Sequence, residues 1–200
     1  MLLSTFKLAF EEVLVSLSAE GLSDRLGQYS PTKRVPVMID GDLTIWDSLA
    51  ICEYISEQYL DGKGWPSDAA KRAKARAVTA EMHAGFTSLR SEMPMNCRAL
   101  RKVDASAQTL RDIARIDQIW AQGRAENGPW LFGEFSIADC FYAPVVMRFK
   151  TYAEASGVVL SEGAQRYQNF FLKNAVLNEW VSAAMQETAI LPEDEAGADW

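Results

Sequence analysis

Two short motifs, Val35-Pro36 and Asp47-Ser48, have the residue types needed to hold a small peptide-like ligand. Proline cannot donate a ladder hydrogen bond, so Pro36 is expected at an edge, a bulge or a turn, where the N–H and C=O of Val35 can pair with a ligand. Asp47-Ser48 stands where a helix is expected to begin, and the unpaired N–H groups there attract a carboxylate. Asp47 is suited to a ligand ammonium. In the simpler interpretation, one of the two is an ordinary N-cap.

A hairpin followed by a helix is expected to position these motifs. The apolar segment Val35–Ile39 predicts a strand, Asp40-Gly41 predicts a tight turn because glycine takes a positive φ, and Leu43–Trp46 predicts the returning strand. The spacing of apolar residues predicts a helix over Ser48–Tyr59. A further strand is predicted over Glu12–Leu17, a short apolar run.

The chain changes character at residues 61–67, where Gly and Pro interrupt the periodicity. We therefore expect a first domain over residues 1–61 and a second domain over residues 67–200. No convincing strand is predicted in the second domain, and Ser136-Ile-Ala-Asp139 fits a capping box at a helix start. Its predicted elements are helices over Asp68–Met93, Ala107–Gly123, Ile137–Phe149, 162–172 and 175–187, followed by an extended acidic tail over Pro192–Trp200.

Composition argues against several functional classes. A formal charge of −7 and a pI near 4.8 disfavour nucleic acid as a partner, because binding to phosphates relies on Lys and Arg. No segment reaches the roughly 18 apolar residues that a membrane span needs. The first fifteen residues lack the features of a secretory signal, so a cytoplasmic protein is expected. Cys52, Cys97 and Cys140, with His83 as the one histidine, have no metal-site spacing and are expected to be reduced packing residues.

The motifs together resemble the cytosolic glutathione transferase family, in particular a bacterial branch of it. Val35-Pro36 and Asp47-Ser48, continued by Leu49-Ala50-Ile51, match the glutathione-binding half in order and spacing, and Ser136–Asp139 matches the helix cap of the second domain. The resemblance implies an α/β thioredoxin-like domain followed by an all-α domain. It also implies a cis Val35-Pro36 bond that presents Val35 to glutathione.

The resemblance further implies a function. Glutathione is expected as co-substrate, bound by Arg34, Val35, Pro36, Asp47 and Ser48, and a small hydrophobic electrophile as its acceptor. A homodimer is expected from the family. The alternative is a non-catalytic relative that binds a ligand or a protein partner through the same scaffold.

The beginning of the chain departs from the family pattern. Met1–Phe6 resembles the middle of the family's first helix, so the thioredoxin-like domain is expected to be incomplete, without the first strand and the catalytic loop. A misplaced start site and a true loss both explain this. Ser4 and Thr5 would fall inside the helix, so the catalytic residue stays unknown. Four residues are candidates either for the electrophile pocket or for the core: His83, Arg90, Met93 and Asn96.

Overall fold

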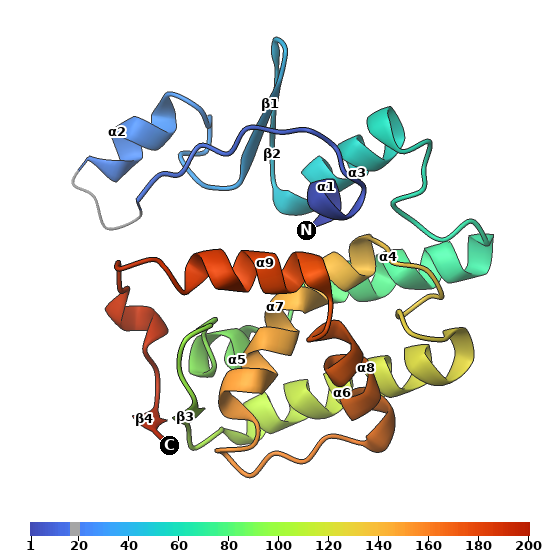
Figure 1. The fold of residues 1–200 in the computed structure, drawn as a ribbon, viewed down its shortest axis with the longest axis vertical. Helices are drawn as coiled ribbons and strands as arrows, with labels where there is room; N and C mark the ends of the chain where they lie inside the picture. The colour runs from blue at the N-terminus through green and yellow to red at the C-terminus, as the bar shows by residue number, and fades with distance from the viewer. Residues whose placement is uncertain (17–20) are drawn as a thin grey trace. The chain divides into compact units, whose positions relative to one another are not determined.

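A computed structural model describes residues 1–16 and 21–200, apart from the side chains of 124–127 and 193. The chain divides into two units, Leu2–Gly64 and Trp65–Trp200, with Met1 grouped with the second (Figure 1). Each unit is described by itself.

The first unit is built around a β-hairpin and the helix that follows it. Its elements are α1 (Leu2–Thr5), α2 (Leu22–Gly27), β1 (Val37–Asp40), β2 (Leu43–Trp46) and α3 (Ser48–Tyr59). The strands pair antiparallel from Val37↔Trp46 to Asp40↔Leu43. The turn is therefore Gly41-Asp42, one residue later than predicted, and Gly41 has the positive φ of 57° that favours glycine. β2 and α3 have the predicted bounds.

The strand predicted over Glu12–Leu17 is wrong for residues 12–16, which form no strand in the structure, while Leu17 lies outside the described residues. A strand requires a neighbour with which to exchange backbone hydrogen bonds. The sheet of this unit contains only β1 and β2 in the described part of the chain. Val13 and Leu14, 61% and 78% exposed, accordingly lie in a segment that joins no strand.

Polar contacts attach the hairpin to α3. The Asp40 carboxylate accepts hydrogen bonds from the hydroxyls of Tyr54, at 2.8 Å, and Tyr59. Both bonds lower the pKa of Asp40, and the bond from Tyr59 has the larger effect. The same bond raises the pKa of Tyr59 to about 12. Ile55, on the same helix, is 2% exposed. The second half of α3 is thus attached to the turn end of the hairpin.

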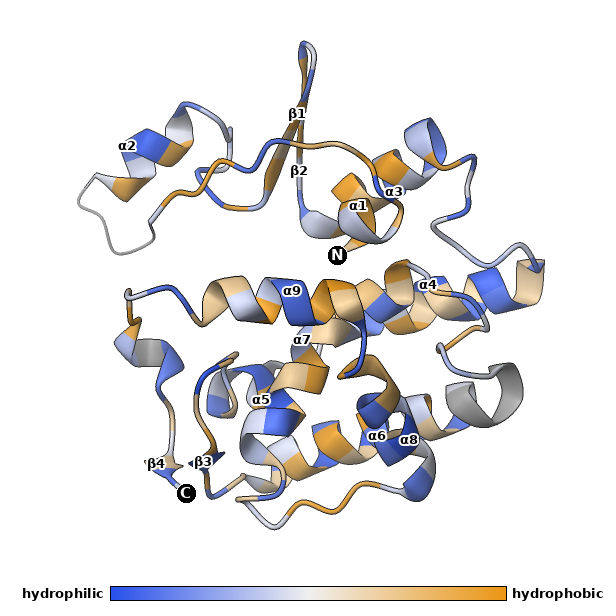
Figure 2. Ribbon diagram, viewed as in Figure 1, coloured by the Kyte–Doolittle hydropathy of each residue, from blue (hydrophilic) through white to orange (hydrophobic). Residues whose placement is uncertain are grey.

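The second unit is helical. Within it α7 packs against α4 and α8, and α6 packs against α5 and α8 (Figure 1). Apolar residues concentrate along α7, as the hydropathy colouring shows (Figure 2), and the ring of Trp120 contacts the rings of Tyr142, Phe149 and Tyr167. The elements are α4 (Ala69–Ala84), α5 (Thr87–Glu92), β3 (Arg101–Lys102), α6 (Ala107–Asn127), α7 (Ile137–Tyr152), α8 (Glu162–Phe171), α9 (Ala175–Ala184), a 3-10 helix (Pro192–Asp194) and β4 (Ala198–Asp199).

The single helix predicted over Asp68–Met93 is wrong, because α4 and α5 are separate. The chain leaves the helix at Gly85 and turns at Phe86, which has a φ of 54°. Phe86 is the N-cap of α5, and its side chain forms no capping hydrogen bond. Instead, Asp112 of α6 accepts a hydrogen bond from the N–H of Leu89 at 3.2 Å. A side chain distant in sequence therefore stabilises the new helix start.

The capping box at Ser136 and Asp139 is confirmed. Asp139 Oδ2 accepts the Ser136 N–H at 3.0 Å, and both halves of the box are present. The carboxylate also accepts hydrogen bonds from the N–H of Leu131 and the hydroxyl of Tyr167, at 3.2 and 2.9 Å. Asp139 is fully buried. It joins the start of α7 to α8 and to the loop before α7.

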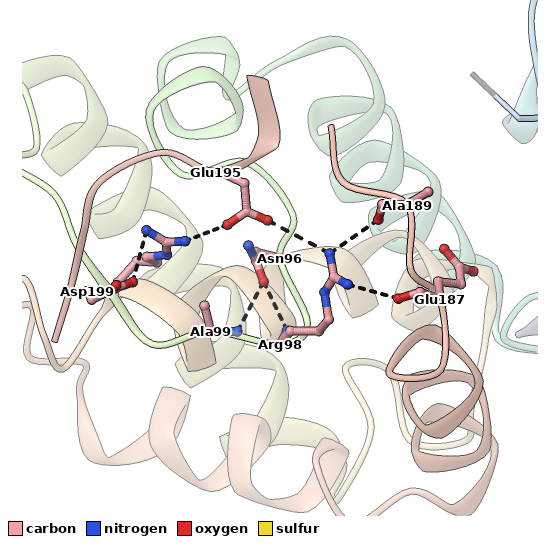
Figure 3. A network of polar contacts seen from close by, with 8 residues as sticks. Asn96, Arg98, Ala99, Glu187, Ala189, Glu195 and Asp199 are labelled. Atoms are coloured by element: carbon pink, nitrogen blue, oxygen red, sulfur yellow. Dashed lines mark hydrogen bonds and ion pairs between the residues drawn. The ribbon is translucent and has the colours of Figure 1, made fainter. Parts of the chain in front are cut away.

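The acidic tail is not simply extended, and the second unit does contain two short strands. β4 in the tail pairs antiparallel with β3. The guanidinium of Arg98 donates to the carbonyls of Glu187 and Ala189, at 2.9 and 3.3 Å (Figure 3). The Glu195 carboxylate lies 4.0 Å from Arg98 and 2.6 Å from Arg101. Arginines far away in sequence thus fold the tail back.

No helix in the described part of the chain is long and apolar enough to cross a membrane.

Candidate functional site

The hairpin register brings the two motifs of the sequence analysis to one end of the hairpin. The last ladder pair is Val37↔Trp46. The residues that follow this pair are Pro36 and Val35 on the side before β1, and Asp47 and Ser48 on the side after β2. The polypeptide segment before β1 and the start of α3 therefore both leave the hairpin at its open end.

The segment before β1 is exposed and has a cis peptide bond between Val35 and Pro36. Val35 is 52% exposed. No hydrogen bond described for this chain uses the N–H or C=O of Val35, so both groups are open to a peptide-like ligand. The cis geometry that the resemblance implied is present.

A buried serine that the sequence analysis did not select shapes the loop that carries Arg34. Ser30 is 2% exposed, and its Oγ accepts the N–H groups of Thr32 and Arg34, at 3.3 and 3.4 Å. A Ser-x-Thr spacing before a strand is the only sequence signal for such a turn. Arg34 itself is exposed beside Val35.

Asp47 is the N-cap of α3, as the simpler interpretation predicted. Its Oδ1 accepts hydrogen bonds from the N–H groups of Leu49 and Ala50, at 2.8 and 3.3 Å. Its backbone has φ 74° and ψ 128°, a rare conformation for a residue other than glycine. Such conformations persist where the surroundings hold them and cluster at binding sites.

Ser48 is the first residue of α3 and is partly exposed. The Asp47 carboxylate accepts the N–H groups of Leu49 and Ala50, while no hydrogen bond among the described residues uses the N–H or the hydroxyl of Ser48. These two donors lie at the positive end of the helix dipole. The geometry therefore suits a carboxylate bound at Ser48.

Cys52, Ser4 and Thr5 lack the environment of a catalytic group. Burial raises the pKa of the Cys52 thiol to about 11, so it is protonated at neutral pH. Ser4 and Thr5 lie within α1 (Leu2–Thr5), as expected. None of these residues is assigned a catalytic role.

Two of the four pocket candidates serve the core of the helical unit. Met93 is completely buried. Asn96 is 6% exposed; its Oδ1 accepts the N–H groups of Arg98 and Ala99, and its carbonyl accepts the Thr151 hydroxyl. Asn96 therefore holds a loop, a role without a local sequence signal.

The other two candidates contact each other. The Arg90 guanidinium donates to the His83 carbonyl at 3.3 Å, and the His83 ring lies 5.7 Å from the ring of Phe141. All three cysteines are free thiols, and no group of acidic, His or Cys side chains among the described residues could hold a metal ion.

Comparison with known proteins identifies both halves of the chain. The model of the glutathione S-transferase N-terminal domain matches residues 1–57, and that of the C-terminal domain matches residues 73–182. Glutathione S-transferase T1 of Arabidopsis thaliana is 30% identical over 148 residues, which is 65% of this chain and 58% of that protein. A stringent starvation protein A homolog of Haemophilus ducreyi is 22% identical over 135 residues, covering 68% of this chain and 61% of that protein. The chain thus spans less than two thirds of the length of these curated relatives.

A solved structure shows the same fold. The glutathione transferase homolog of Burkholderia GL BGR1, with bound glutathione, superposes with a TM-score of 0.68 at 23% identity, over 92% of this chain and 88% of that chain. This supports the expected architecture, a thioredoxin-like first domain followed by a helical second domain. The chain therefore belongs to the glutathione S-transferase family.

Proposed function

We propose that this chain binds glutathione at the open end of its hairpin. The N–H and C=O of Val35, fixed by Pro36, bind the central part of the tripeptide as an added strand would. The N–H and hydroxyl of Ser48 bind the γ-glutamyl carboxylate, and Asp47 binds the ammonium group. Arg34 binds the glycine carboxylate. The observation that carries the proposal is the strand register, in which the ladder ends at Val37↔Trp46, directly next to the two motifs.

The proposed reaction is conjugation of glutathione, as co-substrate, to a small hydrophobic electrophile. A glutathione thiol is mostly protonated at neutral pH, so a catalyst must stabilise the thiolate and orient it toward the acceptor. No described residue is assigned the first task. The proposed site performs the second task, the orientation of the thiol, because it holds the two ends of the tripeptide at separate points.

A second candidate function is ligand or partner binding without catalysis. It is favoured by the lack of an assigned catalytic group, since Cys52 has a pKa of about 11 and Ser4 lies within α1. The similarity to a stringent starvation protein A homolog, a relative not named as a transferase, is compatible with it.

Glutathione titration followed by isothermal calorimetry tests the binding step. Ser48→Ala removes one hydrogen bond to a carboxylate, which is worth roughly 1.5–3 kcal/mol, or about a 10- to 150-fold weaker Kd. Ser161→Ala is the matched control, because Ser161 also starts a helix but lies in the other unit, where its Oγ accepts the Ala164 N–H. Equal affinities in all three proteins, or no heat with the wild type, would refute the site.

Turnover of chlorodinitrobenzene with glutathione then separates the two candidate functions. Conjugation by this chain defeats the non-catalytic alternative. Glutathione binding without conjugation supports that alternative. The experiment uses the same protein preparation as the calorimetry.

We also propose a homodimer in the cytoplasm, as the family relationship suggests. Light scattering after size-exclusion chromatography measures the mass in solution. A mass near the 22.3 kDa of one chain would refute the dimer.

A further inference from the structure

Ser30 holds the loop between α2 and β1 through both its backbone and its hydroxyl. Its N–H donates to the Leu26 carbonyl of α2 at 2.7 Å, and its own carbonyl accepts the N–H of Lys33 at 3.1 Å. Its Oγ accepts the N–H groups of Thr32 and Arg34, at 3.3 and 3.4 Å, and lies 2.9 Å from the Thr32 hydroxyl. A hydroxyl has two acceptor sites and one hydrogen, so the hydrogen of Ser30 is left to donate to Thr32 Oγ1. The hydroxyl of Ser30, a residue that is 2% exposed, is thus fully used inside the loop.

The two cations of this loop have different surroundings. Lys33 is directed back toward α2, because its Nζ lies 4.0 Å from the Asp24 carboxylate and its Cε lies 3.5 Å from the position that a Cβ on Gly27 would take. Arg34 is exposed, and no hydrogen bond or ion pair among the described residues uses its guanidinium. Its N–H, in contrast, is held by Ser30. Arg34 therefore has a fixed backbone and a side chain that can bind a ligand.

We infer that Ser30 is a positioning residue for glutathione, which fixes the backbone from which Arg34 reaches the glycine carboxylate. The inference rests on the proposed function, in which Arg34 binds that carboxylate. Ser30 acts without touching the ligand, because its hydroxyl is buried and already bonded within the loop. A loop that is ordered before the ligand arrives loses less conformational freedom on binding, so affinity is higher. The effect is confined to the glycine end of the ligand, since Asp47 and Ser48 belong to α3 and its N-cap.

Isothermal calorimetry with two ligands tests this role. They are glutathione and its ethyl ester at the glycine carboxylate, which cannot form an ion pair with Arg34. Ser30→Ala should weaken the Kd for glutathione about tenfold, because Arg34 must then be ordered on binding, and should leave the Kd for the ester nearly unchanged. Wild type should therefore discriminate between the two ligands more strongly than the variant. A serine with a merely structural role would lower Tm and leave the ratio of the two Kd values as in wild type.

Ser56→Ala is the matched control. Ser56 is 1% exposed, belongs to the same unit and accepts the Gly64 N–H at 3.2 Å through its Oγ. It lies two turns after Ser48 on α3, outside the loop of Arg34. This variant should lower Tm and keep the wild-type Kd for both ligands.

The outcomes separate this inference from the proposed function. If wild type binds neither ligand, the proposed function is refuted and the positioning role with it. If wild type binds glutathione but the ratio of the two Kd values is equal in wild type and Ser30→Ala, the inference alone is overturned.

A crystal structure of wild type with glutathione decides if Ser30→Ala does not fold. We expect the Arg34 guanidinium within about 3.5 Å of the glycine carboxylate, with the Arg34 N–H still bound to Ser30 Oγ. Arg34 directed away from that carboxylate, or an Arg34 N–H that has left Ser30, would overturn the inference.

Discussion

Asp139→Ala should destabilise the protein strongly, because it removes the acceptor of four buried hydrogen bonds. The carboxylate accepts the N–H of Leu131 at 3.2 Å, the N–H and Oγ of Ser136 at 3.0 and 3.2 Å, and the hydroxyl of Tyr167 at 2.9 Å. The alanine variant leaves at least three buried donors without partners. At about 1 kcal/mol each, the lower end of the usual range, the expected loss in unfolding free energy at pH 7 is about 3 kcal/mol.

The loss should grow as the pH falls. Burial outweighs the hydrogen bonds and raises the pKa of Asp139 from 3.8 to about 6. The folded protein therefore binds a proton more readily than the unfolded chain, and this group adds stability that is complete below pH 3.8 and is lost as the pH rises through 6. The full effect is about 3 kcal/mol, and about half of it is present near pH 5. The difference between wild type and Asp139→Ala should thus be about 1.5 kcal/mol larger at pH 5 than at pH 7.

Urea unfolding followed by tryptophan fluorescence at pH 5 and pH 7 measures this difference. Asp68→Ala is the control, because Asp68 also caps a helix but accepts a single exposed hydrogen bond from the Lys71 N–H at 2.8 Å. The Asp68→Ala substitution should lower the free energy of unfolding by about 1 kcal/mol. An Asp139→Ala loss equal to that of the control, or one that shrinks on acidification, would refute this reasoning.

Three further predictions concern the tail and a thiol. Gly197→Ala should release the tail, because Gly197 has a φ of +82° and a Cβ there would lie 2.4 Å from the Lys102 carbonyl oxygen; faster limited proteolysis within residues 187–200 checks this, and an unchanged rate contradicts it. Glu195→Gln should cost on the order of 1 kcal/mol in urea unfolding through the loss of its ion pair with Arg101, whereas an unchanged midpoint would argue against that role. At pH 8, Cys52 should react with iodoacetamide roughly 100-fold more slowly than free cysteine, because its pKa is about 11; mass spectrometry gives the rate, and fast labelling would contradict it.

Elements whose signals are local were predicted from the sequence. β2 (Leu43–Trp46) and α3 (Ser48–Tyr59) have the predicted bounds, since a glycine turn and a capping aspartate act within a few residues. The cap at Asp139 was confirmed for the same reason, because both partners of the box lie within one turn.

Elements fixed by distant partners were not predicted. The break between α4 and α5 depends on Asp112, which caps the N–H of Leu89 from 23 residues away. The position of the tail depends on the Arg101–Glu195 pair, 94 residues apart. The segment over residues 12–16 has the composition of a strand, but a strand forms only beside a neighbour with open hydrogen-bonding groups. A short window of sequence contains neither the Asp112–Leu89 pair nor the Arg101–Glu195 pair.

The same distinction divides the candidate site. Val35 and Ser48 lie just outside the two strands of one hairpin, so the proposed binding step uses a part of the chain that folds by local rules. Stabilising a thiolate requires a further donor from another element, and neither Cys52, with its pKa of about 11, nor Ser4 in α1 has the environment for this. The proposed binding and the proposed conjugation therefore depend on different groups. A variant such as Ser48→Ala should weaken glutathione binding whether or not the chain performs conjugation.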